Sequence, residues 1–338
     1  MLLIRPITLN DLDQLERLAI ESGPGMTNLP NDRGLLEKKI LRSIASFARP
    51  VSEPGEETYL WVMEDTATAQ VVGTSSIIAS VGLSRPFYSY RVLHLAHTSQ
   101  ELYRYQPVSV LQMVNEYRGV TEIATLYLTP AYRRNGNGKL LSRCRFLMLA
   151  EFPQRFSSLV IAEMRGVHDQ QGHSVFWDSL GQHFFDMEFS KADFLSSLGQ
   201  YQFIADLMPK YPIYICLLPE AAQAVIGVTH PATRPALELL KREGFSFEGC
   251  VDVFDAGPTL HCRLDQIRTV RESNRATVAE IVATVNSESF IISTTGSEDF
   301  RACRGHLRLI ADQTVQITQD VAAALALQPG DTVRFTSF

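Results

Sequence analysis

Long hydrophobic runs are missing from this sequence of 338 residues. Nowhere do about 18 apolar residues follow one another, which is the least that a membrane-spanning helix needs. The first residues, Met1 to Pro6, also lack the basic region and apolar segment of a secretion signal. We therefore expect a cytoplasmic protein that is neither exported nor inserted in a membrane.

Cysteine is scarce as well. The five cysteines are widely spaced, odd in number and without a C-x-x-C pair, which argues against a disulfide framework and a zinc site. The pairs His94 with His97 and His168 with His173 have no neighbouring ligands in a recognised metal-binding pattern. The sequence predicts reduced thiols and no metal.

Positive charge is in the minority, with 31 Lys and Arg against 37 Asp and Glu and a formal net charge of -6. No tract of basic residues occurs, so nucleic acid is not an expected partner. An anionic ligand would need positive charge or backbone N–H groups gathered at one place.

Regular patterns nevertheless cover most of the chain, in which 45% of residues are hydrophobic and 20% charged, as in an average globular protein. We predict strands or hairpins over 2–7, 58–81, 122–128, 158–163, 213–218 and 251–264, and helices over 10–19, 35–47, 139–151 and 231–243. Residues 83–120 allow no assignment. Residues 1–275 are expected to form an α/β (α+β) domain with a mixed, mostly antiparallel sheet flanked by helices. The alternating residues from about Glu280 predict a small β-barrel-like domain over 276–338.

The clearest motif is Arg133-x-x-Gly136-x-Gly138, between a strand and a helix. Taken alone, it would favour a flexible Asn/Gly surface turn. Its flanks, a strand, an amphipathic helix, a second strand and a later helix ending in Glu-Gly-Phe, instead match the acyl-CoA pyrophosphate loop of the GNAT superfamily. Glycines let the backbone approach a phosphate, and the helix N-terminus adds N–H donors. The residues expected to bind the pyrophosphate are Arg133, Arg134, Asn135, Gly136, Asn137, Gly138 and Lys139.

Several stretches narrow this resemblance: TNLP at 27–30, FYSYR at 87–91, GNGKLLS at 136–142, AEMRG at 162–166, ADLMPKYPIY at 205–214 and FDAGPTL at 254–260. Over essentially its whole length the chain resembles the arginine N-succinyltransferase family. That family transfers succinyl from succinyl-CoA to the α-amino group of L-arginine, the first step of arginine degradation to glutamate and succinate. The resemblance implies succinyl-CoA as a co-substrate and no permanently bound cofactor.

The resemblance also implies two site residues. Leu126 corresponds to the family's succinyl-CoA-binding leucine, and His230 to its catalytic proton donor. Without the resemblance, Leu126 reads as a core leucine and His230 as a capping or surface histidine. His230 precedes a helix, whose positive end favours a neutral imidazole. Many GNAT enzymes have a tyrosine proton donor where this chain has Leu240, so another residue must supply the proton.

The sequence gives a less specific indication of the residues that contact the substrates than of the loop that binds the pyrophosphate. Arginine's guanidinium should prefer a carboxylate, for which Glu163, Asp252 and Asp255 are candidates. Arg91 and Arg165 are candidates for binding the carboxylates of the two substrates. Each of these residues could instead form an ordinary salt bridge or turn.

Two alternatives stay open at this point. The chain could be an acyltransferase with another acyl donor or amine acceptor, such as a polyamine or another amino acid. It could also be a non-catalytic paralogous subunit, because we expect a homo-oligomer or a hetero-oligomer with such a subunit. No cysteine lies in a nucleophile motif beside a histidine, which predicts direct attack by the amine without an acyl-enzyme.

Overall fold

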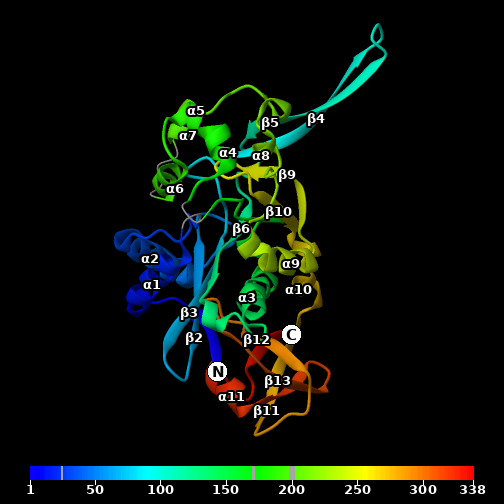
Figure 1. Ribbon diagram of the computed structural model, residues 1–338. Helices are drawn as coiled ribbons and strands as arrows, with labels where there is room; N and C mark the ends of the chain where they lie inside the picture. Colours follow the sequence, from blue (N-terminus) through cyan, green and yellow to red (C-terminus); the bar gives the residue numbers. More distant parts are fainter. Residues whose placement is uncertain (24–25, 170–171, 198–201) are drawn as a thin grey trace.

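The computed structural model describes residues 1–23, 26–169, 172–197 and 202–338. Within these ranges, fifteen strands follow one another in a single continuous sheet (Figure 1). The strands are β1 (Leu2–Pro6), β2 (Thr58–Asp65), β3 (Gln70–Ile78), β4 (Ser89–Ser99), β5 (Arg104–Val114), β6 (Thr121–Leu128), β7 (Leu159–Glu163), β8 (Ile213–Tyr214), β9 (Ser246–Asp252), β10 (Pro258–Arg263), β11 (Asn274–Val282), β12 (Ser289–Thr294), β13 (Ala302–Ala311), β14 (Thr314–Thr318) and β15 (Thr332–Ser337). Their order is β12-β15-β11-β14-β13-β1-β2-β3-β6-β7-β10-β9-β4-β5-β8.

Helices cover both faces of the central strands. The helices are α1 (Leu12–Ser22), α2 (Arg33–Ala48), α3 (Asn137–Glu151), α4 (Val175–Ser179), α5 (Gly181–Phe185), α6 (Phe189–Ser197), α7 (Gln202–Leu207), α8 (Glu220–Gln223), α9 (Arg234–Glu243), α10 (Arg268–Glu272) and α11 (Gln319–Leu325). Helices α1 and α2 pack on one face of β2 and β3, and α3 packs on the other face with α9 and α10 beside it (Figure 1). The expected fold class, a mostly antiparallel sheet flanked by helices with a C-terminal β region, is confirmed.

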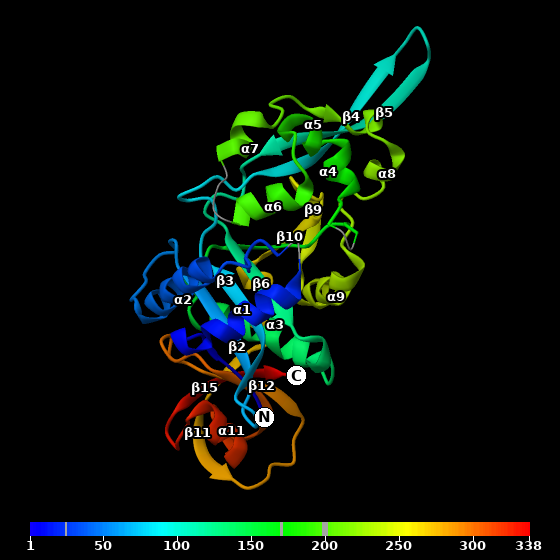
Figure 2. The same cartoon turned by 60° about the vertical axis from the view of Figure 1, so that its left-hand side comes forward.

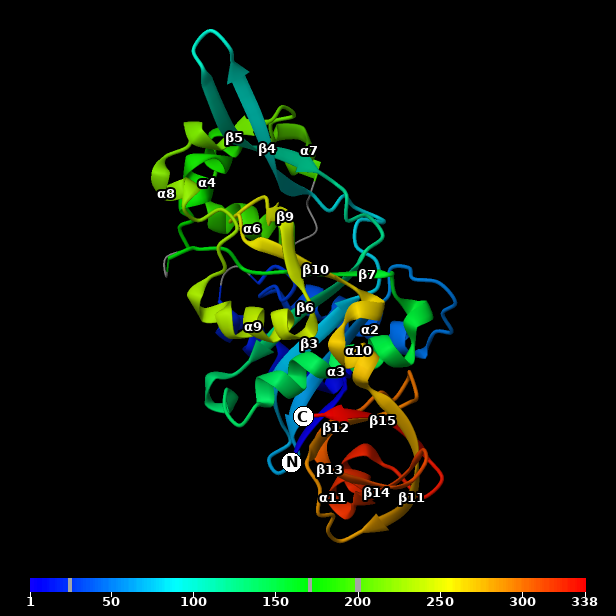
Figure 3. The same ribbon diagram turned by 90° about the vertical axis from the view of Figure 1, so that its right-hand side faces the viewer.

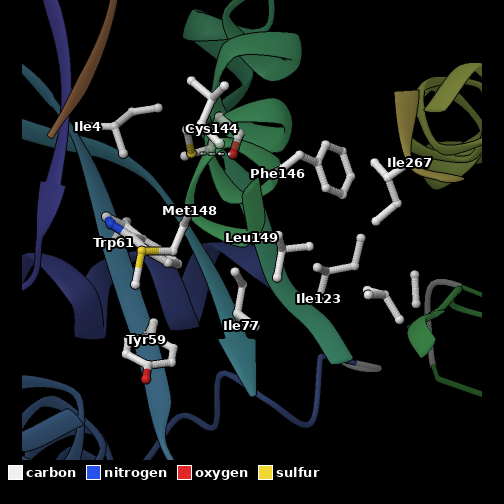
Figure 4. Close-up of a cluster of buried hydrophobic side chains, with 14 of the residues drawn as sticks. Ile4, Tyr59, Trp61, Ile77, Ile123, Cys144, Phe146, Met148, Leu149 and Ile267 are labelled. Carbon is white, nitrogen blue, oxygen red and sulfur yellow. Dashed lines mark hydrogen bonds between the residues drawn. The ribbon is translucent and has the colours of Figure 1, made fainter. Parts of the chain in front are cut away.

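Helix α3 is buried on almost every side. Figure 4 shows Cys144 and Met148 facing Trp61 of β2, while Phe146 points toward Ile267. Residues 140–149 are all buried, although the sequence pattern indicated only one apolar face. The reason is tertiary. The sheet covers one side of α3, and the other sides are covered by α9, α10 and the C-terminal strands. Each large apolar side chain buried here stabilises the fold by about 1.5–3 kcal/mol.

The parallel strands β6 and β7 separate after a short contact. Only Thr121 with Val160 and Glu122 with Ile161 are in register in the described structure. A bulge in β6 then shifts its pairing with β3, and Thr125 within the bulge has a φ of 53°. Beyond Glu122, the β6 edge that faces β7 is therefore open to a ligand.

Residues 83–120, unassigned from the sequence, contain the hairpin β4–β5, which projects far from the body (Figures 1 and 2). At its base, β4 pairs with β9 through residues 89–91. Farther out, residues 93–98 are exposed because, among the described elements, only β5 lies beside them there. The absence of one clear buried face explains why its periodicity was ambiguous.

The C-terminal strands close on themselves, because β12 pairs with both β13 and β15 (Figure 3). They enclose an apolar cluster of their own, which α11 covers. Strand β1 joins this group to the central sheet by pairing with β13. A separate domain beginning at residue 276 stays a prediction. No helix in the described part of the chain is long and apolar enough to cross a membrane.

Candidate active site

Three neighbouring cavities lie at the opening between β6 and β7. The loop cavity, about 560 Å³, is bordered by residues 133–138 and Leu126. The central cavity, about 160 Å³, shares Leu126 and Arg165 with it. The third cavity, about 370 Å³, shares Glu122, Glu163 and Asp252 with the central cavity, and its other charged residues are Glu56, Lys38, Lys39, Arg42 and Arg85. Because walls are shared, the three cavities together form one path from the Gly-rich loop to a group of carboxylates.

The loop that carries the Gly-rich motif is shaped by two left-handed residues, Asn135 with a φ of 53° and Gly136 with a φ of 77°. A Cβ atom on Gly136 would come within 2.6 Å of the Phe338 ring, so only glycine fits there. Among the described hydrogen bonds, none uses the backbone N–H of Asn135, Gly136, Gly138 or Lys139. These donors, at the N-terminus of α3, are free to bind an anion.

The cations of the loop differ in position. Arg133 donates from Nε to the Leu128 carbonyl at 2.8 Å and borders the loop cavity, as does the exposed Arg134. Asn137 borders the same cavity and donates through Nδ2 to the Tyr132 carbonyl. The Lys139 ammonium instead lies 4.7 Å from the centre of the Phe338 ring and does not line the three cavities. The Lys139 side chain therefore lies outside the loop cavity, and its part in anion binding stays a prediction.

Gly138→Asp tests the loop directly. A side chain at Gly138 would meet no atom within 4 Å, so the variant should fold. Its carboxylate would face the bound pyrophosphate, and we expect the Kd for CoA to rise by at least roughly tenfold. Calorimetry with CoA measures this change. Gly296→Asp, another position with open space around it, is the control and should bind CoA normally. Unchanged affinity in a folded Gly138→Asp protein would remove the loop from the site.

His230 lies beside the path. Its backbone N–H donates to the Arg165 carbonyl at 2.8 Å, and its ring stacks on His168 with centroids 4.9 Å apart. Nδ1 accepts a hydrogen bond from the Ala232 N–H at 3.2 Å, so a neutral ring carries its proton on Nε2. Burial lowers the pKa of His230, and the charges of His168 and Arg165 add to this effect. His230 does not itself line the three cavities, whereas Thr233 of the following turn does.

Five carboxylates line the central cavity, those of Glu122, Glu163, Asp193, Asp252 and Asp255. Asp255 accepts hydrogen bonds from the backbone N–H groups of Gly166 and Gly257, at 2.7 and 2.8 Å. Within the described residues, Glu122, Glu163, Asp252 and Asp255 have no Arg, Lys or His partner within 4.0 Å.

The pKa values of these carboxyl groups report their burial. Burial raises the pKa of Glu163 well above its usual value, and the nearby carboxylates of Asp252 and Glu122 raise it further. Burial also raises the pKa of Glu122 to about 7, and burial together with Asp255 raises that of Asp252. The Lys39 ammonium is the cation that opposes the shift at Glu122 most strongly, and burial lowers its own pKa to about 8. The cavity therefore has negative groups in excess and suits a cationic ligand.

Of the two arginines expected at the site, Arg165 lines the central and loop cavities, and its Nη2 donates to the Ser22 carbonyl. Arg91 is not brought together with the other predicted residues. Its guanidinium pairs with Glu116 and donates to the Glu248 carbonyl, away from the three cavities. The reason is that β4 carries Arg91 toward the hairpin, and its charge is already neutralised there.

Sequence reasoning missed three charged residues of the central cavity, Glu122 on β6, Arg145 on α3 and Asp193 on α6. The available signal was a charged residue within an otherwise apolar segment, since Glu122 precedes Ile123-Ala124 and Arg145 precedes Phe146-Leu147. Such a residue is costly to bury and points to a site.

The raised pKa of Glu122 leads to a testable pH dependence. Between about pH 4.5 and 7, Glu122 is protonated in the folded protein but ionised in the unfolded chain, where its pKa has the ordinary value of 4.5. The stability due to this proton is complete below about pH 4.5 and disappears as the pH rises through about 7. The Tm of the wild type minus that of Glu122→Gln should therefore fall between pH 5 and 8. Parallel Tm curves would contradict this, and exposed Glu238→Gln serves as the control.

Comparison with known proteins places the chain in a family. Residues 2–269 match the family described as "Arginine N-succinyltransferase beta subunit", and residues 274–337 match its C-terminal domain. The chain is 42% identical to arginine N-succinyltransferase of Yersinia pestis, covering 100% of this chain and 98% of the relative. For the Enterobacter enzyme the identity is 44%, with 99% and 97% covered.

A solved structure agrees with these matches. The arginine/ornithine succinyltransferase subunit AI from Pseudomonas aeruginosa superposes with a TM-score of 0.91 at 37% identity, covering 100% of this chain and 98% of that one. Sequence and fold thus agree over the full length, and the chain belongs to the arginine N-succinyltransferase family, whose members are acyltransferases.

Proposed function

We propose that this chain transfers a succinyl group from succinyl-CoA to the α-amino group of L-arginine, giving N2-succinyl-L-arginine and CoA. The observation that carries the proposal is the acidic wall of the central cavity, which has five carboxylates; four of them, Glu122, Glu163, Asp252 and Asp255, have no salt bridge in the described chain. A guanidinium is a cation that can bind carboxylates in pairs. The same path leads to a loop suited to the pyrophosphate of an acyl-CoA.

The donor would lie along the path from loop to centre. The pyrophosphate binds the free N–H groups of Asn135, Gly136, Gly138 and Lys139, with Arg133 and Arg134 beside it. The pantetheine arm pairs with the open edge of β6 at Leu126, as an added strand would. The thioester then reaches the central cavity, where β6 and β7 diverge.

The acceptor would approach from the third cavity, on the side where Glu122, Glu163 and Asp252 border the central cavity. Its guanidinium binds the carboxylates around Glu163 and Asp252, which directs the α-amino group toward the thioester. The amine attacks the carbonyl carbon after losing a proton, and the CoA thiolate leaves. The neutral ring of His230 takes up the proton that the attacking amine releases, and the imidazolium so formed gives a proton to the thiolate.

Direct attack fits the position of the thiols. None of the five cysteines lines any of the three cavities, and Cys144, Cys250, Cys262 and Cys303 are buried. Burial raises the pKa of the Cys144 thiol to about 12, which suppresses the nucleophilic thiolate.

The test is a matrix of initial rates. Purified protein is given succinyl-CoA or acetyl-CoA together with arginine, ornithine or lysine, and release of free CoA is followed. We expect succinyl-CoA with arginine to give the highest rate. Ornithine is included because the Pseudomonas relative bears both substrates in its name. A higher rate with acetyl-CoA or with lysine would assign another acyltransferase activity, and no rate with any pair would favour a non-catalytic subunit.

A further inference from the structure

A buried arginine in the centre of α3 has no role in the reaction as described so far. Arg145 is 2% exposed and is one of the residues that line the central cavity. Its Nε donates to the Ser142 carbonyl at 3.1 Å, Nη2 to the Ser142 hydroxyl at 3.1 Å, and Nη1 to the Ala124 carbonyl at 3.3 Å. A guanidinium has five N–H groups, so one on Nη1 and one on Nη2 are left over.

No carboxylate neutralises this charge within the described residues. The other two buried arginines differ from it. Arg143 pairs with Glu243 at 3.0 Å, and Arg155 makes four hydrogen bonds away from the three cavities. Burying a cation without a counter-charge is costly, so an unpaired guanidinium beside a cavity suits an anionic ligand group.

Arg145 lies at the donor's end of the central cavity. It belongs to the helix whose first turn forms the pyrophosphate loop, and its partner Ala124 precedes Leu126 on the open edge of β6. Ile123, Ala162 and Leu240, which also line the cavity, belong to the apolar cluster on the α3 face of the sheet. The Arg145 charge therefore lies where the acyl chain would extend beyond the thioester.

We propose that Arg145 binds the distal carboxylate of the acyl group and so selects acyl-CoA thioesters that end in a carboxylate. This inference rests on the proposed function, because it names what recognises the succinyl group. It also explains how one cavity serves two ligands of opposite charge. The carboxylates near Glu163 attract the guanidinium of arginine and repel the acyl carboxylate. Arg145 instead attracts the acyl carboxylate and repels the guanidinium.

The experiment compares donor and acceptor preferences in the wild type and in Arg145→Met. Methionine has a similar length and no charge. Succinyl-CoA is compared with butyryl-CoA, which has the same number of acyl carbons but no carboxylate. Arginine is compared with agmatine, which lacks the α-carboxylate. In the variant, we expect the succinyl-over-butyryl ratio of kcat/KM to fall by about 10- to 100-fold, the usual effect of losing hydrogen bonds to a charged group. The arginine-over-agmatine ratio should not change.

Two further variants separate this role from others. Arg145→Lys keeps the charge without the planar fork, so it should keep part of the succinyl preference. Arg165→Met removes the other cation of the central cavity and should keep that preference. The Tm of Arg145→Met should not fall, because an unpaired buried charge is removed.

The outcomes distinguish the inference from the proposed function. An unchanged donor preference in Arg145→Met, or its loss in Arg165→Met instead, overturns the inference while succinyl transfer by the wild type stands. A fall in the arginine-over-agmatine ratio would assign Arg145 to the acceptor's carboxylate and also overturn it. A wild type that does not transfer succinyl to arginine removes the proposed function itself.

Discussion

Replacement of His230 by alanine is expected to lower kcat by roughly 10²–10⁴-fold, the range for losing a positioned acid or base. The affinity for succinyl-CoA should stay near that of the wild type, because His230 does not line the loop cavity where CoA is proposed to bind. The physical reason is that the CoA thiolate would then leave without the proton that the His230 imidazolium returns to it. Steady-state kinetics and CoA calorimetry on the same preparation measure both quantities.

The control for this variant is His306→Ala, an exposed histidine of β13, which should keep normal kinetics. Near-normal kcat in His230→Ala would show that another group protonates the thiolate. A succinyl-enzyme found by intact mass spectrometry without arginine would contradict direct attack by the amine.

Glu163→Gln should reduce kcat/KM for arginine by roughly 10²–10³-fold, because breaking a buried charge pair by removing one partner costs about 3–5 kcal/mol. Most of the loss should appear as a higher KM for arginine. Gln resembles the protonated side chain that burial favours in the empty site, so the Tm should not fall.

A neutral analogue makes this test specific. Citrulline has the shape of arginine without the guanidinium charge, and the variant should lose much of the wild type's preference for arginine over citrulline. Glu248→Gln, an exposed residue of β9, is the control and should retain that preference. If Glu163→Gln kept it too, Glu163 would not be a guanidinium ligand.

The sequence by itself determined the features that depend only on residues close together along the chain. The spacing of Arg133, Gly136 and Gly138 between a strand and a helix predicted an anion-binding turn, and the structure has left-handed Gly136 beside free N–H groups at the start of α3. Family resemblance added Leu126 and His230, whose roles stay proposals. A turn and a helix N-terminus are local, so a short stretch of sequence specifies them.

Only the tertiary structure decided which charges share a cavity. Glu122, Glu163 and Asp252 come from β6, β7 and β9, and they lie together because β10 pairs with both β7 and β9. Arg145 faces the same cavity because α3 packs across the strands near Ala124. Arg91, equally plausible in the sequence, is directed to Glu116 instead. Strand pairing and helix packing join residues far apart along the chain, and no local pattern of side chains specifies which distant charges will meet.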